Sequence, residues 1–210
     1  RIGLRTVALE RTANAGTPPA PGARGFPVGR YDEPPDPAGH FLFRVNGVPI
    51  QVRGTNWVPL DAFHSRDAQR LADAMALADD LGCNMIRCWG GNVYEDHAFF
   101  DLCDEKGILV WQDFVFACCR YPQSDSFLAR VRVEAEAVVT RLRNHASLAL
   151  WCGDNEIDEC CASDRLSPEH NRISREILPR VVHRCDPGHP YVPSSPYRAP
   201  EAAGELPEQH

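Results

Sequence analysis

LALWCGDNE, residues 148–156, is the stretch that decides how the rest of the chain is interpreted. Its first five residues are apolar, as in a buried strand. The run then ends abruptly in an asparagine and a glutamate. Burying a carboxylate without a partner costs free energy, so Glu156 must be solvated, paired or functional. Other apolar runs in the chain also end in polar or aromatic residues.

Apolar runs alternate with helical patterns along most of the chain. The helical patterns cover about residues 66–81, 95–106 and 126–143, and a fourth begins near Ser167 and is interrupted by Pro179. The apolar runs end at Asn56-Trp57, Trp89, Asp113, Glu156 and Ser195. Strand and helix repeated in this order are typical of βαβ units, so the sequence predicts an α/β fold with a parallel sheet.

Two parallel-sheet architectures compete. A doubly wound sheet that binds nucleotides carries a glycine-rich loop after its first strand, but this position reads RGTNWVPLDAF, without GxGxxG or GK[ST]. A (β/α)8 TIM barrel places polar and aromatic side chains at the carboxyl ends of its strands. The sequence shows that second pattern, and we predict a TIM barrel and no cofactor.

The first 50 residues suggest a boundary between domains. Residues 1–16 contain one strand-like run with no obvious sheet to join, and we interpret them as the end of a preceding β-sandwich domain. Residues 17–40 are rich in proline and glycine, as in a linker. The dipeptide Asn46-Gly47 then predicts a hairpin that opens the main domain, residues 41–210.

Composition excludes several partners. The net charge of −7 argues against nucleic acid or an anionic membrane as a partner. No run is long enough to span a membrane, and no signal peptide is recognisable. The nine cysteines fit reduced thiols in a cytoplasmic protein. The pairs Cys118-Cys119 and Cys160-Cys161 lack the C-x2-C spacing of zinc sites, so we predict no metal.

The strand ends together describe a carbohydrate site. If all of them face one mouth, tryptophan rings lie beside carboxylates, amides and an arginine, which suits stacking on a sugar and binding its hydroxyls. Trp111 and Trp151 lie within their runs and are expected in the core. The residues that we expect at the mouth are Asn56, Trp57, Arg87, Trp89, Gln112, Asp113, Asp154, Asn155 and Glu156.

Four blocks of the sequence resemble a known family. They read FRVNGVPIQVRGTNWVPLDAF, NMIRCWGGNVYEDHAFFDLCDEKGILVWQDFVFAC, RLRNHASLALWCGDNE and HPYVPSSP. In this order, over about residues 41–197, they resemble the β-mannosidases among the family 2 glycoside hydrolases. The resemblance implies a retaining exo-glycosidase with a (β/α)8 barrel preceded by β-sandwich domains, acting on terminal β-mannosides.

The resemblance also implies roles for individual residues. Glu156 would be the general acid/base, and Asn155 would hold the sugar 2-hydroxyl. Arg87 would orient the nucleophile, Trp89 would line the subsite of the terminal sugar, and Asp113 would bind the sugar. Two positions depart from the family pattern: Asn92 replaces a glycine and Asp154 replaces an asparagine.

The second carboxylate of the family is missing from the sequence. Its nucleophile is a glutamate that ends the seventh barrel strand, whereas this chain contains five strand-like runs. A full barrel needs roughly 250 residues. We therefore interpret the chain as a fragment that has no turnover by itself. Two alternatives remain open: another family 2 enzyme, such as an exo-β-glucosaminidase or a β-galactosidase-like protein, and a non-catalytic carbohydrate-binding fragment. The oligomeric state is not predicted.

Overall fold

The computed structural model describes residues 3–11 and 41–198, which form strands, α-helices, two 3-10 helices (η1 and η2) and one π-helical segment (η3). The elements in chain order are β1 (Val7–Arg11), β2 (Phe41–Val45), β3 (Val48–Ile50), β4 (Gly54–Trp57), η1 (His64–Gln69), α1 (Leu71–Asp80), β5 (Met85–Cys88), α2 (His97–Lys106), β6 (Leu109–Asp113), α3 (Asp125–Leu142), β7 (Leu148–Cys152), α4 (Ile157–Ser163), η2 (Pro168–His170), η3 (Ile173–Ile177), α5 (Leu178–Cys185) and β8 (Tyr191–Val192).

Five strands form a parallel sheet in the order β4-β5-β6-β7-β8. Each strand pairs in parallel with the one that follows it in the chain, for example with Arg87 opposite Trp111. The predicted α/β fold with a parallel sheet is therefore confirmed. The strand order never reverses within these five strands. A doubly wound sheet would contain such a reversal, and its ligand site would lie there.

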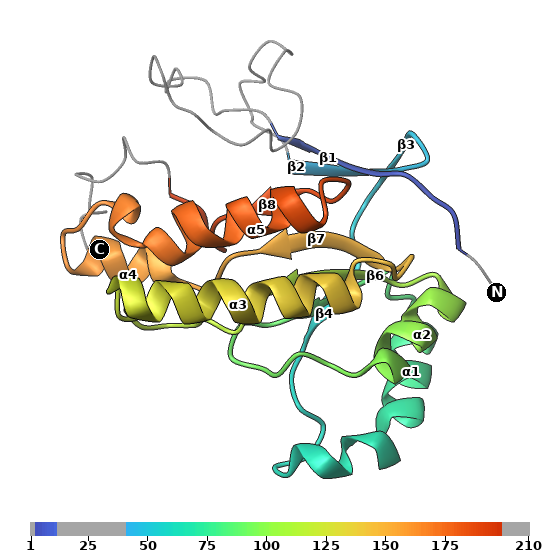
Figure 1. Ribbon diagram of the computed structural model, residues 1–210. Coiled ribbons are helices and arrows are strands. Elements are labelled where there is room, and N and C mark those ends of the chain that lie inside the picture. Colours follow the sequence, from blue (N-terminus) through green and yellow to red (C-terminus); the bar gives the residue numbers. More distant parts are fainter. Residues whose placement is uncertain (1–2, 12–40, 199–210) are drawn as a thin grey trace, which may run out of the picture.

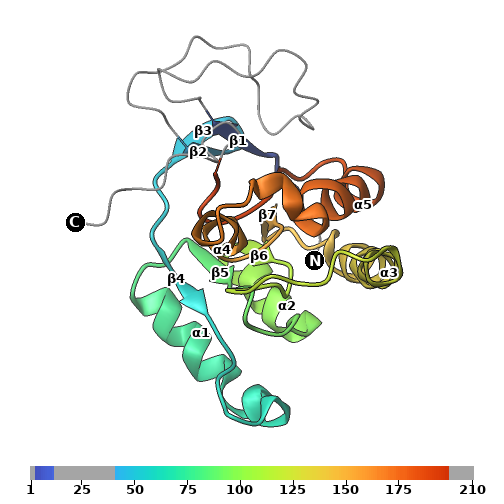
Figure 2. The same cartoon turned by 90° about the vertical axis from the view of Figure 1, so that its left-hand side faces the viewer.

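Helices cover one face of this sheet, which we call the outer face. Ile86, Val110 and Trp151 point from the outer face into the main apolar core, and all three are fully buried. In Figure 2, α1, α2, α3 and α5 follow one another around the outside of the sheet. Helices α3 and α5 lie side by side (Figure 1).

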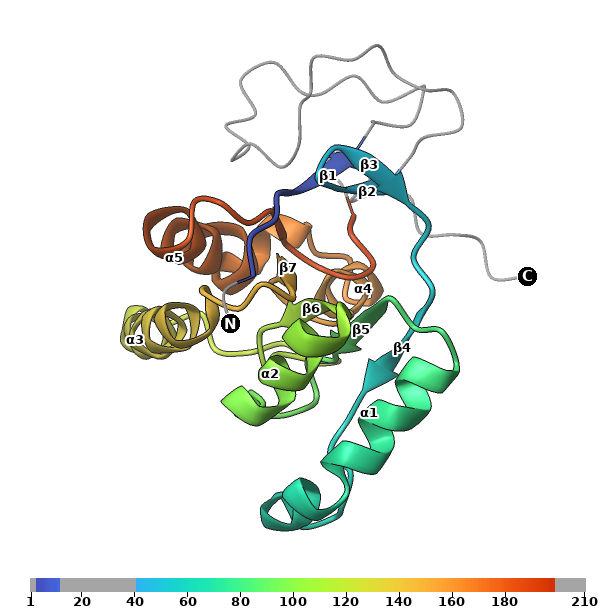
Figure 3. The same ribbon diagram turned by 90° about the vertical axis from the view of Figure 1, so that its right-hand side faces the viewer.

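A small antiparallel sheet, in the order β1-β2-β3, covers the other face, which we call the inner face. Figure 3 shows β1, β2 and β3 together on one side of the parallel strands. Leu9 and Phe43 pack there with residues of the parallel strands, among them Met85, Leu109 and Leu150. Leu9 and Phe43 are opposite one another in the β1-β2 pairing. The expectation that the first strand has no sheet to join is therefore wrong, because β2 is its partner.

Glycine and asparagine end several elements as the sequence predicts. Gly107 ends α2 with φ of 71°, and Gly82, two residues beyond the end of α1, has φ of 68°. Such values are easy for glycine and costly for most other residues. Asn46 and Gly47 have φ of 51° and 78°, as required in the predicted hairpin turn.

Two predicted helices differ from those in the structure. The pattern over 66–81 divides into η1 and α1, because Arg70 between them has φ of −110° and ψ of −12°, outside the regular helix. The predicted fourth helix is divided into η2, η3 and α5: the π-helical η3 passes directly into α5 at Leu178, and Pro179 is the second residue of α5. Proline lacks the N–H of a helical hydrogen bond, and the helix departs from α geometry in the turn just before it.

Among the helices in the described ranges, none combines the length and the apolarity needed to cross a bilayer. The predicted linker, residues 17–40, lies outside the described residues, and so do residues 199–210.

Candidate active site

The turn after β7 depends on a glycine. A Cβ atom on Gly153 would lie 2.3 Å from the carbonyl oxygen of Pro193 and 2.4 Å from the hydroxyl of Tyr191. Distances this short exclude a side chain, so Gly153 lets the chain pass close to the segment around β8. The apolar strand stops at Cys152, and the residues that follow are held by single bridges instead of a full ladder.

Asn155 and Glu156 are fixed between two neighbouring loops. Asn155 forms bridges with Ala117, after β6, and with Ser195, after β8. The Asn155 N–H donates to the Phe116 carbonyl at 2.9 Å, and the Glu156 N–H donates to the Ser195 carbonyl at 3.1 Å. The pair therefore lies at the carboxyl end of the parallel sheet, where parallel-sheet enzymes place their active sites.

Glu156 has an unusual backbone conformation. Its φ is 64° and its ψ is 13°, in the left-handed region, and it immediately precedes α4. A non-glycine residue in this region costs about 1 kcal/mol. Its side chain is exposed, and Oε2 accepts a hydrogen bond from the thiol of Cys118 at 3.5 Å. Such strain collects at functional sites, where the surrounding structure maintains it.

A buried ion pair lies beside this turn. The Arg87 guanidinium donates from Nη2 to Asp113 Oδ2 at 2.7 Å and from Nε to Asp113 Oδ1 at 3.3 Å. Asp113 is fully buried and also accepts from the Gly90 N–H at 3.0 Å and from the Trp111 indole at 2.8 Å. Burial raises the pKa of Asp113, and Arg87 opposes that rise.

Asn155 joins this ion pair to Glu156. Its Oδ1 accepts from Arg87 Nη2 at 2.9 Å, and its Nδ2 donates to the Cys118 sulfur at 3.3 Å. These two partners fix the orientation of the amide. One network therefore contains four predicted site residues: Arg87, Asp113, Asn155 and Glu156. Cys118 links the last two, because its sulfur accepts from Asn155 and its thiol donates to Glu156.

The Trp89 loop lies next to this network. The Gly91 position faces the Trp89 ring so closely that a Cβ atom would lie 2.1 Å from it. Gly90 similarly abuts the Phe116 carbonyl. Asn92, which departs from the family pattern, closes the loop: its N–H donates to the Trp89 carbonyl at 2.9 Å and its Nδ2 donates to the Trp57 carbonyl at 3.1 Å. The Trp89 side chain is half-buried.

The other tryptophans lie on opposite faces of the sheet. Trp57 packs in the outer core at 5.0 Å from the Phe99 ring, with 6% exposure, so the structure does not bring it together with the network. Trp151 is fully buried and stacks on Phe114, as expected of a core residue. Trp111 lies on the inner face below the Arg87 guanidinium, at 5.6 Å.

Asp154, the second departure, points away from the mouth. Its carboxylate is fully buried and accepts from the Ile157 N–H, the Asn171 amide and the hydroxyls of Ser174 and Ser194. Burial raises its pKa to about 6, although these donors oppose the rise. Its observed role is to hold the start of α4 against the segments around Ser174 and Ser194.

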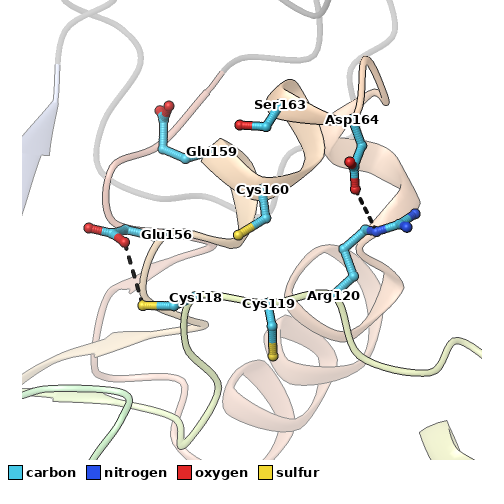
Figure 4. Close-up of a pocket in the computed structure, with 8 residues that line it drawn as sticks. All are labelled: Cys118, Cys119, Arg120, Glu156, Glu159, Cys160, Ser163 and Asp164. Carbon is cyan, nitrogen blue, oxygen red and sulfur yellow. Dashed lines mark hydrogen bonds and ion pairs between the residues drawn. The ribbon is translucent and has the colours of Figure 1, made fainter.

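A cavity of about 350 Å³ opens beside Glu156. In Figure 4 the Cys118 thiol points toward Glu156, while Arg120 and Asp164 pair across the far side of the cavity at 2.8 Å. The cavity is open to solvent and large enough for a small polar group. The residues that line it are Cys118, Cys119, Arg120, Glu156, Glu159, Cys160, Ser163 and Asp164.

Sequence reasoning missed two contributors to this site. Trp111 lies two residues before Asp113, and residues two apart on a strand share a face. The alternation of the strand could therefore have predicted that Trp111 lies beside Asp113. Cys118 gave no such signal, because its contact with Glu156 joins residues 38 apart in the chain.

No protein-family model matches the chain. The β-mannosidase of Bos taurus is 44% identical over 176 residues, which cover 79% of this chain and 20% of the relative. β-Mannosidase B of Thermothelomyces thermophilus is 38% identical over 179 residues, which cover 78% of this chain and 21% of the relative. The crystal structure of the β-D-mannosidase from Dictyoglomus thermophilum is 37% identical, with a TM-score of 0.72 over 93% of this chain and 22% of that one.

The chain resembles a segment of the β-mannosidases in sequence and in fold. This β-mannosidase-like chain spans about a fifth of the length of the curated relatives it matches. The exo-chitosanase of Amycolatopsis orientalis is 22% identical, with a TM-score of 0.65 over 92% of this chain, and shares the fold alone.

Proposed function

We propose that this chain carries the acid/base half of the active site of a retaining exo-glycosidase that hydrolyses terminal β-D-mannosides. The similarity to named β-mannosidases supports a glycosidase, and the identity of 36–44% to them supports mannoside as the substrate. The single observation that carries the proposal is the placement of Glu156. It is an exposed carboxylate on a strained residue, next to the Arg87–Asn155 network and at the carboxyl end of the sheet.

Glu156 acts as the general acid/base. In a retaining mechanism one carboxylic acid protonates the leaving oxygen, and a second carboxylate attacks the anomeric carbon from about 5–5.5 Å away. After the leaving group departs, the same acid/base takes a proton from water. The open cavity beside Glu156 gives the leaving group and the water a route to this carboxylate.

The neighbouring residues position the sugar and the second carboxylate. Arg87 orients the nucleophile, Asn155 binds the 2-hydroxyl, and Trp89 lines the subsite of the terminal sugar. Asp113 has no exposed surface and receives donors from three residues, so we assign it to holding Arg87 in place. Trp57 does not contact the sugar: its carbonyl accepts a hydrogen bond from Asn92 and so holds the loop that carries Trp89.

The nucleophile lies in a part of the protein outside these 210 residues. The carboxylates near Glu156 in the described part of the chain are engaged elsewhere: Asp113 with Arg87, Asp154 with serines, Asp158 with Arg175, Glu159 with Arg198, and Asp164 with Arg120. None of these is free to attack a sugar. The chain spans about a fifth of the length of its relatives, which supports a nucleophile outside this segment.

The order of the strands supports a barrel. We propose that the parallel sheet is the first five strands of a (β/α)8 barrel, because its strands follow the chain order without reversal and the small sheet covers its inner face. Residues 1–16 remain assigned to the end of a preceding β-sandwich domain, with β1 reaching the barrel by pairing with β2.

The decisive experiment uses the full-length protein that contains this segment. Glu156→Gln should reduce kcat about 10²-fold to 10⁴-fold for 4-nitrophenyl β-mannoside, the usual contribution of general acid/base catalysis. The loss in kcat/KM should be smaller for a dinitrophenyl leaving group, which needs little protonation, and azide should restore kcat by attacking the glycosyl-enzyme without deprotonation. The matched control is Glu159→Gln, because Glu159 lines the same cavity but pairs with Arg198. Equal losses in both variants would reject Glu156 as the acid/base.

A second measurement tests whether this segment is active by itself. The 210-residue chain should not hydrolyse 4-nitrophenyl β-mannoside, because one carboxylate of the pair is absent. Turnover that disappears in Glu156→Gln would show that the nucleophile lies within the chain. Saturable quenching of tryptophan fluorescence by mannose without hydrolysis would instead identify a carbohydrate-binding fragment.

Substrate choice within the fold is tested on the full-length protein with aryl β-mannoside, β-glucosaminide and β-galactoside. The β-mannoside should have the highest kcat/KM. A higher value for β-glucosaminide would favour the exo-glucosaminidase alternative.

A further inference from the structure

Three ligand-type side chains outside the Arg87–Glu156 network converge in the segments that follow β4 and β5. They are His64 and Asp67 of η1, which follows β4, and Glu95, which precedes α2. One ligand atom from each lies within 4.8 Å of the other two. His64 is partly exposed, whereas Asp67 and Glu95 are each only 6% exposed.

The two buried carboxylates have few partners. Asp67 Oδ2 accepts from His64 Nδ1 at 2.8 Å, but Asp67 Oδ1 is buried without a hydrogen-bond donor. Glu95 Oε1 accepts from the Trp57 indole at 3.0 Å. Within the described residues, neither carboxylate pairs with an arginine or a lysine. Burial raises the pKa of Glu95; the Trp57 indole and His64 oppose that rise, and the charge of Asp67 adds to it.

A buried oxygen without a donor costs about 1–3 kcal/mol. A second negative charge nearby adds to that cost. A cation bound between the carboxylates removes both penalties, because it neutralises the charge and accepts the lone pair of Asp67 Oδ1. The buried unpaired oxygen therefore points to a missing ligand rather than to a solvated acidic face.

We propose that His64, Asp67 and Glu95 bind a divalent first-row transition-metal ion. One imidazole nitrogen and two carboxylate oxygens suit Mn²⁺ or Zn²⁺, with metal–ligand distances of about 2.0–2.2 Å. Ligand atoms around such an ion lie up to about 4.4 Å apart, so small side-chain movements close the site. The exposed side of His64 leaves a path for entry and room for water ligands.

The ion would fasten two loops at the carboxyl end of the sheet. His64 and Asp67 follow β4, and Glu95 follows β5. Glu95 also holds the indole of Trp57, whose carbonyl accepts from Asn92 in the Trp89 loop. Metal binding would therefore stiffen the loop that carries Trp89. The proposal does not depend on the glycosidase assignment.

The test is a titration of the 210-residue chain with Mn²⁺, followed by electron paramagnetic resonance of the free ion. Mn²⁺ is the better probe because the nine cysteines would capture Zn²⁺. We expect wild type to bind one equivalent of Mn²⁺. The dissociation constant should rise at least tenfold in His64→Ala and in Asp67→Asn. It should not change in Asp101→Asn. Asp101 is the matched control: it belongs to a second acidic cluster, with Asp104 and His145, in which Asp104 receives donors on both oxygens.

His64→Ala changes a partly exposed side chain and is expected to fold, which circular dichroism checks. Glu95→Gln provides a third variant of the site. The proposal is overturned if wild type shows no saturable Mn²⁺ binding, or if His64→Ala and Asp67→Asn bind as tightly as wild type. It is equally overturned if Asp101→Asn loses as much affinity as they do.

Discussion

The two faces of the parallel sheet differ in the side chains that they bury. The outer face presents Ile86, Val110 and Trp151 to the helices and forms the main apolar core. The inner face begins in the same way, with Met85 and Leu109 under the small sheet, but it ends in an arginine and a buried aspartate. An apolar layer and a charged layer thus share one face of the same strands.

Two tryptophans on adjacent strands show the contrast. Both donate the indole N–H to a buried aspartate, Trp151 to Asp186 and Trp111 to Asp113. Trp151 is fully buried and stacks on Phe114, so its burial stabilises the hydrophobic core. Trp111 instead supports the Arg87–Asp113 pair from below. The same residue type therefore stabilises the fold on one face and positions the site on the other.

The largest effect on stability is expected on the outer face. Trp151→Ala should lower the free energy of unfolding by about 4 kcal/mol, since it empties a fully buried aromatic site. Trp111→Ala is the matched control and should cost less, because the Trp111 ring is partly exposed. Urea unfolding of the 210-residue chain measures both. Equal losses of unfolding free energy in Trp151→Ala and Trp111→Ala would contradict the proposed difference between the two faces.

The next effect concerns the ion pair of the inner face. Arg87→Ala should cost about 2–3 kcal/mol, because it leaves Asp113 buried without its cation; this is at or below the usual range for buried pairs, since Arg87 is partly exposed. Adding Asp113→Asn should recover part of the loss in the same urea experiment. The control is Arg132→Ala, which removes one of the two arginines that pair with the exposed Glu136 and should cost much less. A loss in Arg87→Ala no greater than in this control would contradict the assignment.

Asp154 provides a test through pH. Its pKa is raised to about 6 in the folded chain, above its ordinary value of 3.8, so the folded state holds this proton more tightly than the unfolded state. Its contribution to stability is therefore complete below about pH 4 and is lost as the pH rises through about 6, a total of about 3 kcal/mol.

Asp154→Asn removes that dependence. The free energy of unfolding of wild type minus that of the variant should fall between pH 4 and pH 6 and then level off. Urea unfolding at four pH values between 4 and 7 measures it, and other groups cancel in the difference. A flat difference would show that Asp154 does not titrate in this window.

The smallest expected effect is at Glu156 itself. Glu156→Gly should leave the free energy of unfolding unchanged or raise it by up to about 1 kcal/mol, because glycine accepts a φ of 64° without strain. Arg165→Gly is the matched control, since Arg165 is exposed and has φ of 57°. Similar changes in both chains are expected, with activity of the full-length protein lost only in Glu156→Gly. A large destabilisation specific to Glu156→Gly would mean that its side chain supports the fold.

The sequence predicted much of the fold because the local signals were strong. The six apolar positions of α3, from Leu128 to Leu142, are all buried as their helical spacing requires. The pairing of β1 with β2 was missed, because the chain between them, residues 12–40, separates the two strands in sequence. The break of a predicted helix at Arg70 was also missed, since nothing in its residue type demands it.

By itself, the sequence determined the parallel α/β fold and brought together Arg87, Asp113, Asn155 and Glu156 as residues at strand ends. Period and chain order suffice for this, because parallel strands all end at the same edge of the sheet. Only the tertiary structure decided which of these side chains are buried and what they contact. It directed Asp154 into a serine network, placed Trp57 in the core and set Cys118 against Glu156. Those outcomes depend on contacts between residues far apart in the chain, which no local pattern encodes.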